Sequence, residues 1–382
     1  MKGLLQKLKQ DPVFTISAVL AIVSCLVIHP DSAYLGYFNM DTLIMLFCLM
    51  LIVAGLKQLN FFAWMGQTVL KKIHSQRGIL LTLVFLCFFS SMFITNDVAL
   101  ITFVPFGISM LEMVGMTPSM CFAVVMMTIA ANLGSMFTPV GNPQNLYLYA
   151  VSGMKIGEFF ALMLPLTLLS AVCLFLAVSL FGVRKSEDSA KESRKQDKST
   201  QTSVQKENLR YNKQSGFWLI LFFCSLLSVA GVISKLMLLV VVVLAVGILD
   251  RSVFKRIDYA LLGTFCCFFV FIGNMNRMEA LREILVQVLA GRECAVAVVL
   301  SQIISNVPAA ILLSGYTSNI RGLIVGTNLG GLGTLIASMA SLISYKQIAV
   351  WNPQLRKTYL IVFTGWNVAM LAVLLVGAYL MG

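Results

Sequence analysis

Polar residues and glycines interrupt the long apolar stretches of this sequence, where they could bind a small ion. Thr95-Asn96-Asp97 and Ser305-Asn306-Val307-Pro308 are two such interruptions, and two more run from Asn132 to Asn145 and from Thr327 to Thr334. Inside a bilayer, non-helical backbone survives only where it is buried in protein or lines a wet cavity. Such breaks can present carbonyl and amide oxygens to a cation and helix N-termini to an anion. The four interruptions therefore predict a binding site.

The interruptions recur in the same order in the two halves of the chain. Residues 91–99 align with 301–309 at an offset of 210, with Ser, Ile, a hydroxyl residue, Asn and Ala repeated. Asn132-Leu133-Gly134 aligns with Asn328-Leu329-Gly330 at an offset of 196. This ordered recurrence predicts two repeats, each with a re-entrant hairpin and a discontinuous transmembrane helix.

The composition is that of an integral membrane protein. Of 382 residues, 59% are hydrophobic and 12% are charged, against roughly 45–50% and about 25% in a soluble domain. Apolar runs of spanning length lie near 13–29, 41–57, 158–181, 216–234, 258–275 and 358–381, with a shorter run at 236–249. Together with the interrupted regions they predict an all-α polytopic protein with about 9–11 membrane segments.

One polar stretch divides the chain. Residues 184–214 are rich in Lys, Ser, Gln and Glu and can neither sit in lipid nor build a core. We expect a basic cytoplasmic linker there. The expected organisation is a first repeat at 1–183, with its hairpin tip at 95–97 and its helix break at 132–145, and a second repeat at 215–382, with its tip at 305–308 and its break at 327–334.

Basic residues predict the orientation. With a cytoplasmic N-terminus, 22 of the 28 Lys and Arg residues lie inside, as the positive-inside rule requires. Five crossings then separate the starts of the runs at 41–57 and 258–275. Because this number is odd, the second repeat is expected to have the opposite orientation in the membrane, so that the repeats are inverted. The C-terminus is expected to be extracytoplasmic, in a bacterial-type inner (plasma) membrane. The basic residues predicted outside are Lys155, Lys235, Arg277, Arg282, Arg292 and Arg321.

Charge and motifs argue against other classes of protein. A net charge of +12 would favour nucleic-acid binding in a soluble protein, but basic cytoplasmic loops explain it here, so no nucleic-acid partner is expected. The sequence contains no nucleophile elbow, no Walker A loop and no His/Cys metal spacing. We therefore expect no enzyme and no cofactor beyond a coupling ion. A membrane scaffold with vestigial helix breaks is the alternative from another class.

Asp97 is unusual among the 16 acidic residues, because the other fifteen lie in loops, in the linker or at the ends of spans. No Lys, Arg or His accompanies it within the apolar segments. A carboxylate in that setting holds a cation or takes up a proton. The alternative is a hydrogen-bonded cap on the hairpin tip. Amides at this depth are also costly unless they bind something.

At 95–99, at 131–145 and at 305–308 the sequence resembles the ion transporter superfamily. That group includes divalent anion/sodium symporters, citrate transporters, arsenite permeases and one branch of sodium/proton antiporters. The resemblance covers nearly the whole chain. It implies a scaffold domain for homodimerisation in the lipid bilayer and a transport domain with two hairpins that moves as an elevator. It also implies a small anionic substrate and Na⁺ or H⁺ as coupling ion.

The resemblance also assigns roles. It implies one cation site at Ser91, Thr95, Asn96 and Gly134 and a second at Ser301, Ser305, Asn306 and Gly330, with Na⁺ as the candidate metal. To these cation ligands we add Asp97, Asn132 and Asn328. Substrate contacts are expected from Asn96, Asp97, Asn142, Asn145, Asn306 and Thr334.

The hairpin tips leave the substrate open. In the dicarboxylate branch each tip reads Ser-Asn-Thr, whereas Asp97 and Val307 stand at the third positions here. The favoured function is a permease for a carboxylate or an inorganic oxyanion. An arsenite/antimonite-type efflux permease or a sodium/proton antiporter is the alternative.

Overall fold

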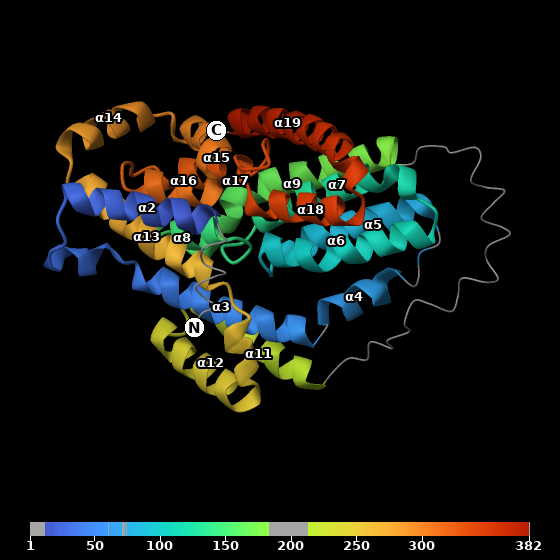
Figure 1. The fold of residues 1–382 in the computed structure, drawn as a ribbon, viewed down its shortest axis with the longest axis horizontal. Coiled ribbons are helices and arrows are strands. Elements are labelled where there is room, and N and C mark those ends of the chain that lie inside the picture. Colours follow the sequence, from blue (N-terminus) through green and yellow to red (C-terminus); the bar gives the residue numbers. More distant parts are fainter. Residues whose placement is uncertain (1–11, 60, 71–72, 74, 183–212, 382) are drawn as a thin grey trace. The chain divides into compact units, whose positions relative to one another are not determined.

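The fold is known from a computed structural model that describes residues 12–59, 61–70, 73, 75–182 and 213–381. Within these ranges every regular element is a helix (Figure 1). The all-α class predicted from the sequence is therefore confirmed. The predicted linker lies outside the described residues, except for Lys213 and Gln214, which begin a helix.

The chain is an integral, multi-pass membrane protein. Among the described residues, six helices are long and apolar enough to cross a membrane, or seven when one bent pair is counted as a span. The six are Met40–Gln58, Asn96–Met113, Thr117–Ser135, Ile156–Phe181, Tyr259–Asn276 and Pro353–Met381. Shorter apolar helices occupy Val13–Val27, Gln76–Ser91, Ser215–Val229 and Lys235–Leu249.

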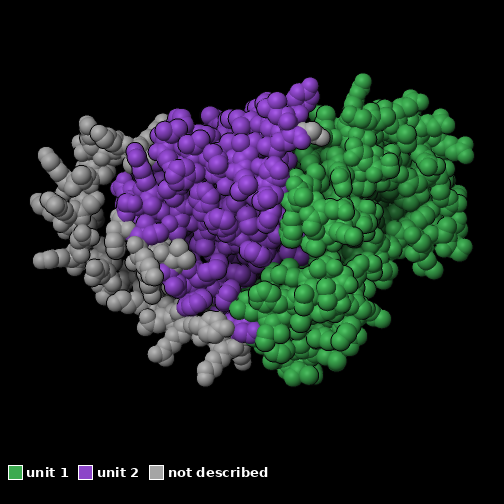
Figure 2. Space-filling view, turned by 180° about the vertical axis from the view of Figure 1, so that it is seen from behind, with its two compact units in different colours: residues 1–56, 143–162, 217–331 green, residues 57–142, 163–216, 332–382 purple. Residues whose placement is uncertain are grey.

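The helices form two compact units (Figure 2), of which the first comprises residues 1–56, 143–162 and 217–331. Its helices are α2 (Pro12–Val27), α3 (Met40–Gln58), α8 (Pro143–Ser152), α11 (Lys213–Val229), α12 (Lys235–Leu249), α13 (Tyr259–Asn276), α14 (Glu279–Leu289), α15 (Glu293–Ile304), α16 (Asn306–Ser314) and α17 (Ile320–Leu329), with the short helices η1 (Ser32–Tyr37) and η3 (Arg251–Lys255) and the start of α9 (Ile156–Phe181).

Small residues let the helices of the first unit approach one another closely. A Cβ atom on Gly263 of α13 would lie 2.6 Å from the ring of Phe14 on α2. A Cβ atom on Gly326 of α17 would lie 2.5 Å from the carbonyl oxygen of Cys294 on α15. Glycine at these positions therefore allows the packing of α2 on α13 and of α15 on α17.

The second unit comprises residues 57–142, 163–216 and 332–382. Its described helices are α4 (Phe61–Leu70), α5 (Gln76–Ser91), α6 (Asn96–Met113), α7 (Met120–Ser135), most of α9, α18 (Met339–Trp351) and α19 (Arg356–Met381), with η2 (Thr117–Ser119) and η4 (Pro353–Leu355).

Helix α7 is the core of the second unit. All of its residues are buried except Phe122, whose ring packs edge-on against Trp366 of α19 with centroids 5.4 Å apart. Helices α5, α6, α18 and α19 contact α7. A helix that is apolar on every face requires neighbours on every side, so α7 fixes the helices around it.

Each predicted hairpin tip overlaps the junction of two consecutive helices, although of 95–97 and 305–308 only Thr95 and Ser305 lie outside helices, because Asn96 and Asn306 already begin α6 and α16. The first is the turn from Ser91 to Asn96, between α5 and α6, and the second is Ser305, between α15 and α16. Helices α15 and α16 have 12 and 9 residues, or about 18 Å and about 14 Å at 1.5 Å per residue, which is too short to cross a core of about 30 Å. The lengths favour a re-entrant second hairpin. Helices α5 and α6 are longer, with 16 and 18 residues. A re-entrant first hairpin therefore stays a prediction.

The two helix breaks differ from their predicted bounds. Helix α7 continues past Asn132 to Ser135 and α8 begins at Pro143, so the first break covers 136–142. The second covers 330–338 and ends four residues later than predicted. The reason is that Asn is tolerated in a terminal helical turn, and that Pro suits the first turn of a helix, where its missing N–H is not needed.

Each compact unit takes helices from both predicted repeats. Helix α8, from the first repeat, contacts α16 and α17 in the first unit. Helix α18, from the second repeat, contacts α6 and α7 in the second unit. The inverted repeats themselves stay a prediction, but each hairpin packs against a helix that follows the other break.

Candidate functional site

The side chain of Asn132, in the last turn of α7, joins three segments of the second unit. Its Oδ1 accepts hydrogen bonds from Asn96 Nδ2 at 2.9 Å and from Ser338 Oγ at 3.1 Å. Its Nδ2 donates to Ser341 Oγ at 3.5 Å. All four residues are buried. We name Asn96, Asn132, Ser338 and Ser341 the first amide cluster.

Other predicted residues surround the first amide cluster. A Cβ atom on Gly134 would overlap the carbonyl oxygen of Phe88 and would lie 2.5 Å from Ser91 Oγ, so only glycine fits. The backbone N–H of Asn96 donates to Gly141 O at 3.2 Å, which ties the hairpin tip to the helix break. The structure thus brings Ser91, Asn96, Asn132 and Gly134 together, as the sequence predicted.

Asn142 lies in the first break, close to the cluster. Its Nδ2 donates to Ser135 Oγ at 3.1 Å, and Ser135 Oγ in turn donates to Asn132 O at 2.9 Å. Thr138 of the same break donates to the carbonyl oxygen of Met92 at the hairpin tip. The first break is therefore a hydrogen-bonded structure and not an open loop.

Thr95 and Asp97 flank Asn96 at the start of α6 and are both half-buried. The backbone N–H of Asp97 donates to Asn96 Oδ1 at 3.0 Å. A carboxylate in the first turn of a helix interacts favourably with the helix dipole. Asp97 thus places a carboxyl group beside the first amide cluster.

The second amide cluster lies in the first unit and consists of Asn145, Asn306, Asn328, Ser301 and Gln302. Asn328 Nδ2 donates to Asn145 Oδ1 at 2.5 Å, and Gln302 Nε2 donates to Gly330 O at 2.9 Å. A Cβ atom on Gly330 would lie 2.7 Å from Ser301 Oγ, which repeats the close approach of Ser91 and Gly134. Ser305, at the tip, has a φ of 76° and is the one residue other than glycine with a positive φ in the described part of the chain.

The amide of Asn306 differs from that of Asn96. It is buried, and a Cβ atom on Gly331 would lie 2.9 Å from its Nδ2. Among the residues that the structure describes, this amide forms no hydrogen bond. It therefore retains its full capacity to bind a ligand.

The two clusters share one design. Each combines the Asn of a hairpin tip, the Asn in the last turn of the helix before a break, and a polar side chain from the helix that follows the other break. Ser338 and Ser341 have this third role in the first cluster and Asn145 has it in the second. Thr334 is exposed and belongs to the second unit, whereas Asn145 and Asn306 belong to the first.

Four participants were missed from the sequence: Ser135, Gln302, Ser338 and Ser341. Gln302 directly follows a predicted ligand, Ser301, and it is an uncommon residue in an apolar segment, so its type was a usable signal. Ser338 and Ser341 are three residues apart at the start of a helix. That spacing places them on one helix face, but serine is common in membrane helices and its presence alone was no signal.

Hydroxyl, amide and carbonyl oxygens are the ligands that hard cations such as Na⁺ accept. In the described ranges, no group of three or more His, Cys, Asp or Glu side chains could hold a metal ion. Both clusters thus offer neutral oxygen donors, with the Asp97 carboxylate beside the first one. Such an arrangement can bind a small cation together with an anion.

Helix breaks that carry buried amides, within an all-α multi-pass fold, are the architecture of a membrane transporter. The chain belongs to the citrate transporter family, which it matches over residues 4–321. It is 31% identical over 306 residues to an uncharacterized transporter of Methanocaldococcus jannaschii, covering 80% of each chain. It is 28% identical to the inner membrane protein YbiR of Escherichia coli, covering 90% of this chain and 89% of that protein. A third relative is arsB of Dictyostelium discoideum, described as a candidate transporter, with 30% identity over 38% of this chain and 26% of that protein. The chain is therefore a transporter of this family.

Proposed function

We propose that the protein is a secondary active transporter that moves a small carboxylate or inorganic oxyanion, coupled to Na⁺ or H⁺, by an elevator-type movement. The observation that carries this proposal is the presence of two buried amide clusters of one design, each at a hairpin tip and a helix break. Burying amides costs free energy that binding of an ion and its substrate would offset.

In this proposal the first cluster binds the cation and the second binds the anion. Asn132 Oδ1 and the Asp97 carboxylate are oxygen ligands for a cation at the first cluster. The Asn306 amide can donate to an anion at the second. The first turns of α8 and α16, which carry Asn145 and Asn306, add positive dipole ends. No Lys or Arg takes part, so a bound cation would supply the charge that holds the anion.

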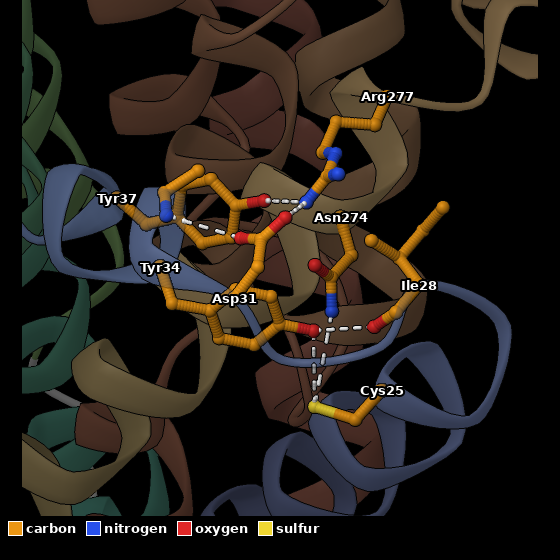
Figure 3. A network of polar contacts seen from close by, with 8 residues as sticks. Cys25, Ile28, Asp31, Tyr34, Tyr37, Asn274 and Arg277 are labelled. Carbon is orange, nitrogen blue, oxygen red and sulfur yellow. Dashed lines mark hydrogen bonds and ion pairs between the residues drawn. The ribbon is translucent and has the colours of Figure 1, made fainter.

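Three ion pairs of the first unit agree with the predicted order of membrane crossings. Each pair joins a basic residue that is predicted to lie outside to an acidic residue that the same topology also places outside. The pairs are Lys235 with Asp41 at 2.5 Å, Arg277 with Asp31 at 2.8 Å (Figure 3) and Arg321 with Glu158 at 3.4 Å. Partners on opposite sides of a bilayer could not meet. This agreement concerns only which segment ends share a side of the bilayer; the cytoplasmic N-terminus in an inner membrane is proposed from the distribution of Lys and Arg.

The proposal is tested by uptake into proteoliposomes, with the substrate chosen by a thermal-stability screen. The screen combines Na⁺ or Li⁺ with carboxylates, sulfate, phosphate and arsenite over a range of pH. An anion that stabilises the protein only with Na⁺ would identify coupled symport.

We then expect Asn96→Ala and Asn306→Ala to abolish uptake while insertion into the membrane persists. Ser109→Ala, at an exposed position of α6, is the control and should retain uptake. Normal transport by both Asn variants would overturn the proposal.

The alternative is an arsenite-type efflux permease or a sodium/proton antiporter. The similarity to arsB supports the first, and the Asp97 carboxylate is the titratable group that the second requires. An antiporter should lose pH-dependent Na⁺ flux in Asp97→Asn. The variant keeps the bond from the backbone N–H of residue 97 to Asn96 Oδ1, and its melting temperature serves as the control for folding. Unchanged flux would contradict the antiporter, because the Asp97 carboxylate is the group that would carry its proton.

A homodimer is part of the proposal, because elevator movement needs a scaffold fixed in the lipid. The chain mass is 42.0 kDa. Light scattering of the detergent-solubilised protein, corrected for detergent, should give twice this mass. A value equal to one chain would contradict the dimer without affecting the transport assay.

A further inference from the structure

The second hairpin tip reverses the chain at a single residue. Ser305 alone joins α15 to α16, whereas residues 92–95 separate α5 from α6 in the first hairpin. Ser91, the last residue of α5, aligns with Ser301, so α15 continues three residues further into its tip than α5 does. The second tip is therefore the tighter of the two.

This tight reversal places Ser305 in a backbone conformation that is unfavourable for any residue with a side chain. Its φ is 76° and its ψ is 155°, a region that is essentially restricted to glycine. The aligned residue, Thr95, has a φ of −57° and a ψ of 147°, which is close to ordinary polyproline II backbone. Because the two ψ values nearly agree, the tips differ at this position mainly by rotation about one bond, N–Cα.

The helices around the second tip hold Ser305 in this conformation. Its backbone N–H donates to Ser301 O at 3.0 Å, and its carbonyl oxygen accepts the Ala309 N–H at 3.1 Å. The residue is thus bonded into α15 on one side and into α16 on the other. Both helices pack on α17, and α16 also packs on α8. Strained residues persist only where the surrounding structure holds them, so Ser305 can relax only if an end of one helix unwinds.

The two backbone conformations accompany two states of the side chain that follows. After Thr95, Asn96 Nδ2 donates to Asn132 Oδ1 at 2.9 Å. The aligned pair, Asn306 and Asn328, forms no such bond among the described residues. Asn306 is nevertheless only 5% exposed. A buried amide without a partner is unfavourable, so the second tip combines backbone strain with an unfilled hydrogen-bonding capacity.

We propose that Ser305 is a positioning residue for the second amide cluster. Its strained backbone keeps the Asn306 amide from the bond to Asn328 that the first tip forms, and thereby keeps this amide available to an anion. Strain that holds a side chain ready before the ligand arrives is preorganisation. The role in anion binding rests on the proposed function, whereas the strain itself does not.

The competing explanation is that the strain only follows from the length of α15 and has no effect on Asn306. Both explanations predict that glycine at position 305 stabilises the fold. They differ in what added strain does. Under the proposal, added strain favours a relaxed tip and weakens anion binding through Asn306. Under the competing explanation, added strain lowers the stability and leaves the affinity unchanged.

Thermal unfolding of the full chain in detergent, without added ligand, tests the strain. Ser305→Gly and Ser305→Ala both lack the hydroxyl group, so their difference reports on the backbone. Glycine adopts the observed φ freely, and we expect Ser305→Gly to melt about 1–4 °C above Ser305→Ala. At the first tip the sign should reverse, with Thr95→Gly melting below Thr95→Ala, because glycine there only adds freedom to the unfolded chain. A Ser305→Gly variant that melted no higher than Ser305→Ala would overturn the proposal.

Titration of the sodium salts of citrate, sulfate and phosphate, with thermal stability as readout, tests the effect on binding. Potassium chloride at matched ionic strength is the salt control. Ser305→Thr keeps the hydroxyl group, but a β-branched residue is least tolerated at a positive φ. We expect the apparent affinity for the stabilising anion to fall about 3- to 10-fold as the competent tip becomes less populated. Ser109→Thr adds the same methyl group at an exposed position of α6 and should leave the affinity unchanged.

A double variant separates positioning from stability. In the Asn306→Ala background, Ser305→Thr should still lower the melting temperature but should weaken anion binding no further. Equal affinity in the parent and in Ser305→Thr, together with a loss of binding in Asn306→Ala, would overturn this inference and leave the proposed function intact. If instead Asn306→Ala bound every anion as the parent does, the proposed function would fail and the positioning role with it, while the melting comparison of Ser305→Gly with Ser305→Ala would still report on the strain.

Discussion

The two amide clusters arise from the same repeated motif, yet their hairpin asparagines are in different states. Asn96 is bonded to Asn132, and Asn132 also accepts a hydrogen bond from Ser338. Asn306 is equally buried, but its amide forms no hydrogen bond among the described residues, and the bond of its cluster runs between Asn328 and Asn145. The first cluster is thus internally satisfied and lies beside a carboxylate, whereas the second has an amide available to a ligand. A repeated motif can therefore hold one hairpin asparagine in a hydrogen-bonded network and leave the amide of the other available to a ligand.

The largest difference in stability is expected from the paired glycines. In Gly134→Ala the new methyl group would overlap the backbone carbonyl oxygen of Phe88, which cannot rotate away. In Gly330→Ala the nearest atom, at 2.7 Å, is the Ser301 hydroxyl oxygen, which can rotate, and the nearest backbone atom, the Gly326 carbonyl oxygen, lies at 2.8 Å, short of the overlap at Gly134. Overpacking costs about 1–3 kcal/mol, so we expect Gly134→Ala near the top of this range and Gly330→Ala near the bottom.

Thermal unfolding in detergent measures this difference. Gly365→Ala in α19 is the control, because no atom lies within 4 Å of the added methyl group, and it should not lower the melting temperature. A larger loss in Gly330→Ala than in Gly134→Ala would show that the second cluster is the more tightly packed one, contrary to the structure.

A smaller difference is expected from the central asparagines. Asn132→Ala would leave both Asn96 Nδ2 and Ser338 Oγ without their acceptor, whereas Asn328→Ala would leave Asn145 Oδ1 without its donor. Each buried group that loses its partner costs about 1–3 kcal/mol. We expect the free energy of unfolding to fall by about 2–6 kcal/mol in Asn132→Ala and by about 1–3 kcal/mol in Asn328→Ala. Denaturant titration of both variants gives the values, and equal losses would mean that the first cluster is no more connected than the second.

Sequence reasoning succeeded where the signal is local. Apolar runs predicted the long helices to within a few residues, as with 158–181 for α9 (Ile156–Phe181). These predictions hold because burial of apolar surface and the cost of polar groups in lipid act on each segment separately.

The rest depends on contacts between distant segments. Ser338 reaches Asn132 across 206 residues of chain, and no property of an isolated serine indicates this. The difference between Asn96 and Asn306 could not be predicted from the sequence either, because in both motifs a hydroxyl residue is followed by Asn. It depends on backbone conformation, since Thr95 has a φ of −57° and the matching Ser305 has a φ of 76°. Packing of the surrounding helices decides which conformation each tip adopts.

The smallest effect on stability is expected at the hairpin asparagines themselves, and it separates structure from binding most sharply. Asn96→Ala removes a buried hydrogen bond and leaves one of the two bonds to Asn132 Oδ1 unfilled, so it should cost about 1 kcal/mol. Asn306→Ala removes an amide that makes no such bond in the described structure and should cost less than Asn96→Ala. Melting temperatures of the two variants, measured without substrate, would reveal the difference. Adding the substrate found in the screen should then stabilise Asn96→Ala partly and Asn306→Ala hardly at all. If Asn306→Ala is instead the less stable variant and still responds fully to substrate, its amide is structural, and the two clusters are more alike than their hydrogen bonds indicate.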